Sequence, residues 1–119
     1  MKTSSAKAKG RRCAAKARDL LLKFACNLEP DDIIITSSGE TGEDLKLSPR
    51  ARIQFPWSIE CKNVEKLNIY KAMEQAKTHG DYSPVVFHMK NRTDLHITMK
   101  AKDFFKFLVE EGLGGSDAE

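Results

Sequence analysis

Three side chains near the middle of the chain have the types and spacing that phosphodiester hydrolysis requires. Glu60 and Lys62 lie two residues apart in an apolar run that reads as a strand. Since alternate strand residues share a face, the carboxylate and the ammonium are expected to project side by side. Asp44 lies sixteen residues before Glu60, directly after a turn-rich segment with two glycines. Two carboxylates can hold a hard cation, and a lysine can orient water and offset phosphate charge. The alternative is a weak surface ion pair.

Eight helices and strands are expected to position these side chains. Apolar periodicity and turn residues predict helices over 6–26, 64–79 and 101–111, and strands over 33–36, 44–47, 57–62, 85–89 and 95–99. Ser48 and Pro49 start a helical turn between the second and third strands. The chain is therefore predicted to be an α/β protein whose mixed β-sheet is flanked by helices, in the order α-β-β-β-α-β-β-α. A single domain over 1–111 and a disordered tail over 112–119 are expected.

Composition is that of a globular protein. Of the 119 residues, 40% are hydrophobic and 31% are charged. No stretch is apolar enough to span a membrane and none resembles a signal peptide, so we expect a cytoplasmic protein with no membrane partner. The three cysteines, Cys13, Cys26 and Cys61, show no CxxC spacing. Reduced, buried thiols are therefore expected in preference to a zinc site.

Charge is distributed unevenly along the chain. Residues 1–27 carry eight lysines and arginines against Asp19 alone, a balance of +7, while the remainder carries −4. A basic end on an acidic chain predicts a polyanion partner such as DNA, although a merely solvated helix face is the alternative. The candidate nucleic-acid contacts are Lys7, Lys9, Arg11, Arg12 and Lys16 on the first helix, and Arg50 and Arg52 in the helical turn.

Taken together, these residues and elements resemble a known superfamily. Asp44, the Glu60-Cys61-Lys62 tripeptide and the α-βββ-α-β order are similar to the PD-(D/E)XK phosphodiesterases, which have the restriction-endonuclease-like fold. The resemblance covers residues 6–110 and is closest to small phage and archaeal nucleases described as Holliday junction resolvase-like. It rests on the runs Gly42-Glu43-Asp44, Leu47-Ser48-Pro49, Ala51-Arg52, Phe55-Pro56 and Ile59-Glu60-Cys61-Lys62-Asn63.

The resemblance implies roles for individual residues. Asp44, Glu60 and the backbone carbonyl of Cys61 would bind Mg²⁺, for which Mn²⁺ can substitute, and Lys62 would align the attacking water. Gln75, on the helix after the Glu-x-Lys strand, would support the site or contact phosphate, with a solvated helix position as the alternative. The implied protein is a homodimeric endonuclease that cuts branched DNA in recombination, in the host cytoplasm if it comes from a phage. The alternatives are a flap- or single-strand-specific nuclease and an inactive nucleic-acid-binding module.

The chain departs from the family pattern in its first helix. Many members place a glutamate there, whereas the matching run Lys9 to Ala14 holds no acid. The number of metal ions therefore stays open, and Glu43 or Glu40 is a candidate to complete the site. Pro30-Asp31-Asp32 spells the family motif but precedes the isoleucine strand, so we interpret it as a polar loop, with a metal ligand as the alternative.

Other residues that can do chemistry receive simpler interpretations. His79, His88 and His96 suggest a metal site or a general base, but they read better as ordinary surface histidines. Trp57 is expected to be a buried anchor in preference to a base-stacking residue. The aromatic cluster of the last helix is expected to form core or a subunit contact, with Phe104 or Phe107 in a dimer interface. Phe105 and Leu108 belong to the same cluster.

Overall fold

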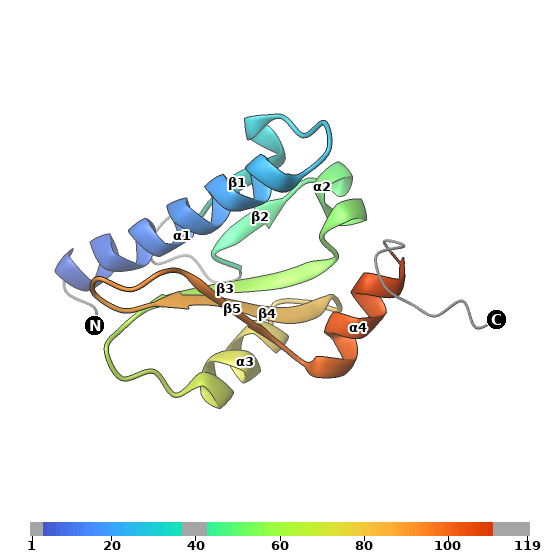
Figure 1. Ribbon diagram of the computed structural model, residues 1–119. Coiled ribbons are helices and arrows are strands. Elements are labelled where there is room, and N and C mark those ends of the chain that lie inside the picture. Colours follow the sequence, from blue (N-terminus) through green and yellow to red (C-terminus); the bar gives the residue numbers. More distant parts are fainter. Residues whose placement is uncertain (1–3, 37–42, 111–119) are drawn as a thin grey trace.

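The computed structural model describes residues 4–36 and 43–110 (Figure 1). The predicted helices and strands are all present in the predicted order, and two short helices, η1 and α2, lie among them. The elements are α1 (Ser4–Phe24), η1 (Pro30–Asp32), β1 (Ile33–Ile35), β2 (Leu45–Leu47), α2 (Pro49–Gln54), β3 (Trp57–Asn63), α3 (Ile69–Lys77), β4 (Ser83–Met89), β5 (His96–Met99) and α4 (Ala101–Glu110). The tail over 112–119 and most of the glycine-containing turn lie outside the described residues.

The expected mixed sheet is divided into two hydrogen-bonded sheets. β1 and β2 form an antiparallel pair, while β3 pairs with β4 in parallel and β4 pairs with β5 in antiparallel fashion. β2 is only three residues long. Asp44, the residue before β2, forms a hydrogen bond to β3 by donating its N–H to the Ile59 carbonyl at 3.2 Å. The molecule is thus an α/β protein with mixed pairing, whose two sheets meet edge to edge at Asp44.

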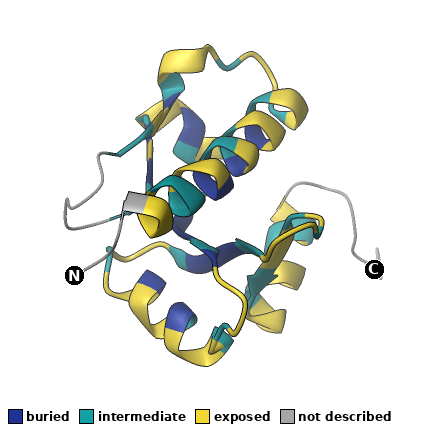
Figure 2. Cartoon of the chain, turned by 90° about the vertical axis from the view of Figure 1, so that its left-hand side faces the viewer, coloured by how far each residue is buried: buried dark blue, intermediate teal, exposed yellow. Residues whose placement is uncertain are grey.

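Helices cover both faces of β3 and β4. α1 lies on one side of the three-stranded sheet and α3 on the other (Figure 1). The larger core joins the buried side of α1, including Cys13 and Ala17, to Ile59 and Cys61 of β3. The smaller core lies under α3. In Figure 2 the buried residues of α1 lie on its sheet-facing side. Both faces of β3 are therefore covered, which explains why its polar residues Ser58, Glu60 and Asn63 are buried along with its apolar ones.

Several helix boundaries differ from the prediction, the start of α3 most of all. α3 begins at Ile69, five residues later than predicted, because the Asn68 side chain accepts a hydrogen bond from the Lys71 N–H at 3.1 Å and caps the helix there. Residues 64–68 form a connection instead of a first turn. α1 ends at Phe24, two residues early, and Asn27 shortly beyond it has a positive φ of 56°.

Trp57 is the anchor that the sequence predicted. It is 6% exposed, and its ring centroid lies 5.2 Å from those of both Phe55 and Phe107. Phe107 thereby joins α4 to the core, whereas Phe104 and Phe105 stay largely exposed. Within 4–36 and 43–110, no helix combines the length and the apolar character needed to cross a bilayer.

Candidate active site

Asp44 is hydrogen bonded to β3 at the point where the two sheets meet. Its backbone N–H donates to the Ile59 carbonyl at 3.2 Å, and its side-chain Oδ2 accepts from the Cys61 N–H at 2.7 Å. Ile59 and Cys61 therefore direct their backbone groups toward the same strand edge. Because the N–H and C=O of one strand residue point to the same edge, the Cys61 carbonyl is also on the side of Asp44.

Glu60 and Lys62 form the side-by-side pair that the alternation predicted. Glu60 Oε2 lies 3.2 Å from Lys62 Nζ, and the two side chains are 5% and 20% exposed. Glu60 Oε1 lies 2.7 Å from Nε2 of His79, whose side chain is 9% exposed. The pair is thus a buried arrangement with partners on both carboxylate oxygens, and the surface ion-pair alternative is wrong.

His79 is the site residue that sequence reasoning missed. It was interpreted as a surface histidine, but the packing of α3 on β3 brings it against Glu60 from two residues beyond the helix. Gly80, which follows with φ of 150°, adopts a conformation that side chains rarely take. The only sequence signal was the position of His79 at the expected helix end, and that position does not reveal which strand residue it meets.

The donor set suits a hard cation that keeps most of its water. Mg²⁺ is usually bound through one or two carboxylates plus substrate phosphates, so Asp44, Glu60 and the Cys61 carbonyl have the right chemistry. Among the described residues, no group of three or more His, Cys, Asp or Glu side chains is arranged to hold a metal. A cation here would have to share Glu60 with Lys62 and His79.

The other acids that were candidates for metal ligands and lie in the described residues, Glu43 and Asp32, have bonding partners elsewhere in the protein. Glu43 accepts two hydrogen bonds from Arg52 Nη2, at 2.6 and 2.9 Å, and Glu40 lies outside the described residues. Asp32 belongs to η1, where Oδ2 accepts from the Glu29 N–H at 2.8 Å and Oδ1 from Ser48 Oγ at 2.7 Å. These two bonds, that from Ser48 foremost, lower the pKa of Asp32. Asp32 therefore stabilises a turn, as the polar-loop interpretation expected.

Cys61 turns its side chain away from Glu60 and toward α1. On that side the Cys13 sulfur lies 3.5 Å from the Lys62 carbonyl and 3.6 Å from the Phe87 carbonyl. The neighbouring Cys61 thiol lowers the pKa of Cys13, whereas the neighbouring Cys13 thiol and burial raise the pKa of Cys61. All three cysteines are free thiols as predicted, but Cys26 is exposed because it follows the end of α1.

The basic residues of α1 lie mainly on its outer surface. Cys13, Ala14 and Ala17 face the core, and the positions around them are left to solvent. Lys9 is half-buried, and its carbonyl accepts from Asn63 Nδ2 at 3.1 Å. The exposed members of the predicted contact set on α1 are Lys7, Arg11, Arg12 and Lys16.

The two arginines of α2 are bonded within the protein. Arg50 donates to the Asn27 carbonyl. Arg52 binds Glu43, donates Nη1 to the Trp57 carbonyl at 2.8 Å, and lies 4.2 Å from the centroid of the Tyr82 ring. Arg52 therefore contributes to structure, and phosphate contact by either arginine stays a prediction.

The remaining candidates are not among the bonding partners of Glu60, although His88 is the Cα partner of Lys62 on the neighbouring strand β4. The Gln75 side chain is exposed on α3, and its carbonyl accepts from Thr78 Oγ1 at 2.7 Å, so its catalytic role stays a prediction. His88 and His96 stack with their centroids 5.6 Å apart, and His88 Nε2 lies 2.8 Å from Thr98 Oγ1. Burial, and then His96, lower the pKa of His88.

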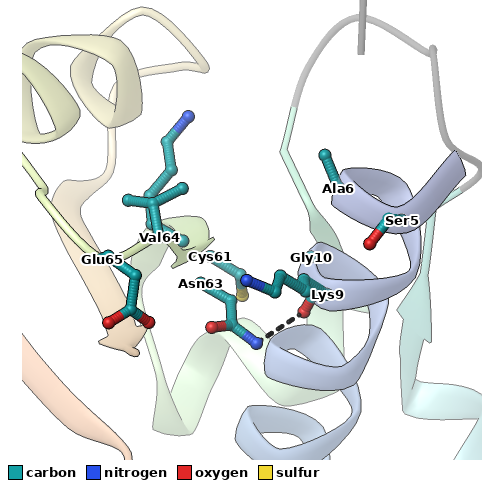
Figure 3. A pocket seen from close by; sticks show the side chains of 9 residues that line it. Ser5, Ala6, Lys9, Gly10, Cys61, Asn63, Val64 and Glu65 are labelled. Atoms are coloured by element: carbon teal, nitrogen blue, oxygen red, sulfur yellow. Dashed lines mark hydrogen bonds between the residues drawn. The ribbon is translucent and has the colours of Figure 1, made fainter. Parts of the chain in front are cut away.

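A cavity of about 370 Å³ adjoins Lys62 at the end of β3. It lies between the first turns of α1 and residues 61–65. Figure 3 shows the Lys9 side chain extending from α1 toward Cys61 and Asn63, with the Glu65 carboxylate on the other wall. Lys9 of α1 and Lys62 of β3 are both among the residues that line the cavity, although the Lys62 ammonium is paired with Glu60.

No protein-family model, curated protein or solved structure matches the chain. The resemblance to the PD-(D/E)XK superfamily therefore stays a prediction from the residues.

Proposed function

We propose that the protein is a Mg²⁺-dependent DNA endonuclease, selective for branched DNA and active as a homodimer. The observation that carries the proposal is the buried Glu60, paired with Lys62 at 3.2 Å on the strand to which Asp44 is bonded. Burying a charged carboxylate and an ammonium is costly unless both are well paired. Ion pairs that serve only as surface contacts do not need this burial, so the burial of Glu60 is an observation in favour of a functional role.

Each residue has a defined task in the proposed hydrolysis. Mg²⁺, when bound, would activate a water molecule and stabilise negative charge on the phosphate. Asp44, Glu60 and the Cys61 carbonyl would hold the cation. Lys62 would orient the water for in-line attack on phosphorus and offset charge on the phosphoryl oxygens. His79 would keep the Glu60 carboxylate in place, since it holds the oxygen that Lys62 does not.

The basic surface of α1 supports DNA as the substrate. Its exposed lysines and arginines can contact phosphates, which position a duplex without reading its sequence. A chain of 119 residues with one Asp44/Glu60 cluster makes one nick. Cutting a four-way junction needs two nicks on opposed strands, so two protomers related by a two-fold axis would be required.

A gel series with four DNA structures tests this function. Four-way junction, flap, duplex and single-stranded DNA are incubated with the protein and Mg²⁺ or Mn²⁺. We expect nicking, strongest on the junction, and its loss in Asp44→Asn and Glu60→Gln with the circular dichroism spectrum unchanged. Asp31→Asn, at an exposed acid of η1, is the matched control and should cut normally. Wild-type rates in both site variants would show that the site is wrongly assigned.

The second candidate is a binding module that has lost its chemistry. It is favoured by the absence of an acid in the Lys9 to Ala14 run and of a three-ligand metal group among the described residues. This candidate predicts DNA binding with no cleavage under either metal.

A cruciform plasmid and light scattering test the proposed dimer. A dimeric enzyme yields linear DNA directly, whereas a monomer accumulates nicked circles.

A further inference from the structure

Cys13 and Cys61 lie in the core between α1 and β3. Cys13 is 0% exposed and Cys61 is 6% exposed, and the Cys13 sulfur lies 3.6 Å from the carbonyl of Phe87, which is the Cα partner of Cys61 on β4. The Cys13 sulfur also lies 3.5 Å from the Lys62 carbonyl, one residue beyond Cys61. A disulfide requires two sulfurs about 2.0 Å apart on well-placed backbones. Cys13 and Cys61 belong to the same buried cluster between the packed helix and strand, so their sulfurs are placed to approach that separation.

A small oxidant has a route to this pair. Cys61 is one of the residues that line the cavity of about 370 Å³ at the end of β3 (Figure 3). Hydrogen peroxide is small enough to enter a space of this size. It can therefore meet the Cys61 side of the pair while the helix stays packed on the sheet.

We propose that Cys13 and Cys61 are an oxidation site that closes to an intramolecular disulfide in the folded protein. One thiol takes an oxygen atom from hydrogen peroxide: the O–O bond breaks, an S–O bond forms, and water leaves a sulfenic acid behind. The second sulfur attacks the first, the S–S bond forms, and the S–O bond breaks with release of a second water. The two thiols lose two electrons, which the peroxide gains.

The disulfide would link two functionally distinct parts of the molecule. α1 carries the exposed basic residues, and Cys61 lies between Glu60 and Lys62. The new bond would fasten the helix to this strand and would restrict the unfolded chain between positions 13 and 61, which raises stability when the native geometry accommodates it. This inference does not depend on nuclease activity, because the two cysteines share one buried cluster whatever the site does.

The test uses Cys26→Ser, which removes the exposed cysteine and leaves only the buried pair. The folded variant is treated with hydrogen peroxide, alkylated under denaturing conditions, and analysed by intact mass and peptide mapping. We expect a product that has lost two hydrogen atoms, takes up no alkylating agent, links the peptides of Cys13 and Cys61, and returns to dithiol with dithiothreitol. Its melting temperature should exceed that of the reduced form.

Two further arms make the result decisive. Cys13→Ala/Cys26→Ser retains Cys61 alone and should not lose two hydrogen atoms. Oxidation of Cys26→Ser in urea tests whether the fold prepares the pair, and linkage should be faster in the folded protein. The proposal is overturned if the folded protein keeps both thiols free, if linkage occurs only in urea, or if the disulfide lowers the melting temperature. Peptide mapping of oxidised wild type, with Cys26 present, must show the same link.

Discussion

The Nε2 atom of His79 lies 2.7 Å from Oε1 of Glu60, so a histidine after α3 holds one oxygen of a carboxylate in the middle of β3. The other oxygen belongs to Lys62, at 3.2 Å. A buried carboxylate that loses one of its partners keeps its desolvation cost without compensation. The geometry of Glu60 therefore depends on the docking of α3, which lies on the opposite side of the sheet from α1.

Removing the imidazole should weaken the fold and misplace Glu60. His79→Ala leaves Oε1 without its partner and is expected to lower the free energy of unfolding by about 1–3 kcal/mol. His79→Gln, which can still donate a hydrogen bond, should recover part of this loss. Urea denaturation measures the change, and His96→Ala, at an exposed histidine of β5, is the control. Equal stability of His79→Ala and wild type would show that the contact contributes nothing.

Arg52 should matter for stability, whether or not it also contacts phosphate. Its guanidinium binds Glu43, the Trp57 carbonyl and the Tyr82 ring, so Arg52→Ala leaves Glu43 unpaired. We expect a loss of about 1–3 kcal/mol in the free energy of unfolding. Arg50→Ala, which removes only an exposed hydrogen bond to Asn27, should cost much less. A variant Arg52→Ala with unchanged stability and weaker DNA binding would contradict the structural role and support Arg52 as a phosphate contact.

Acid should loosen the turn that Asp32 stabilises. Hydrogen bonds from Ser48 and from the Glu29 N–H lower the pKa of Asp32 below its usual 3.8. With the pKa lower in the folded state, the unfolded chain binds the proton more readily, so this contribution is complete above the unfolded pKa and is lost as pH falls through the folded pKa. Stability measured from pH 5 downward should therefore fall less steeply in Asp32→Asn than in wild type. Parallel curves for the two proteins would contradict this linkage.

Part of this architecture follows from local sequence rules. The pairing of Glu60 with Lys62 was predictable because the strand repeat places alternate side chains together. The role of His79 was not, because it depends on how α3 packs across the sheet. The late start of α3 depends on Asn68, whose side chain competes successfully for the helix cap.

Contacts between residues far apart in the sequence are the other feature that could not be predicted. The sequence indicated five strands, but only the contact of Asp44 with β3 shows where the two sheets meet. Nothing in the local pattern distinguishes an arginine that binds phosphate from one that binds Glu43. Either role requires the same type of side chain, and only the folded structure determines whether its partner is phosphate or a carboxylate of the protein.

The exposed basic residues of α1 should set the salt dependence of DNA binding. Each lost phosphate contact is expected to reduce the slope of log affinity against log salt by roughly 0.9. The triple variant Arg11→Gln/Arg12→Gln/Lys16→Gln should therefore bind all DNA structures more weakly and with a shallower slope. Circular dichroism should be unchanged, because these three side chains are exposed on α1. Fluorescence anisotropy across a series of salt concentrations measures affinity and slope together.

The matched control removes the same charge from the other end of the molecule. Lys100→Gln/Lys102→Gln/Lys106→Gln changes three exposed lysines at and before α4, so its net charge equals that of the α1 variant. A general electrostatic effect would weaken binding in both variants alike, whereas a DNA surface on α1 predicts that only the α1 variant loses slope. An unchanged slope in the α1 variant would place the DNA surface elsewhere. Because Arg50 donates only to an exposed carbonyl, it would then be the next residue to replace.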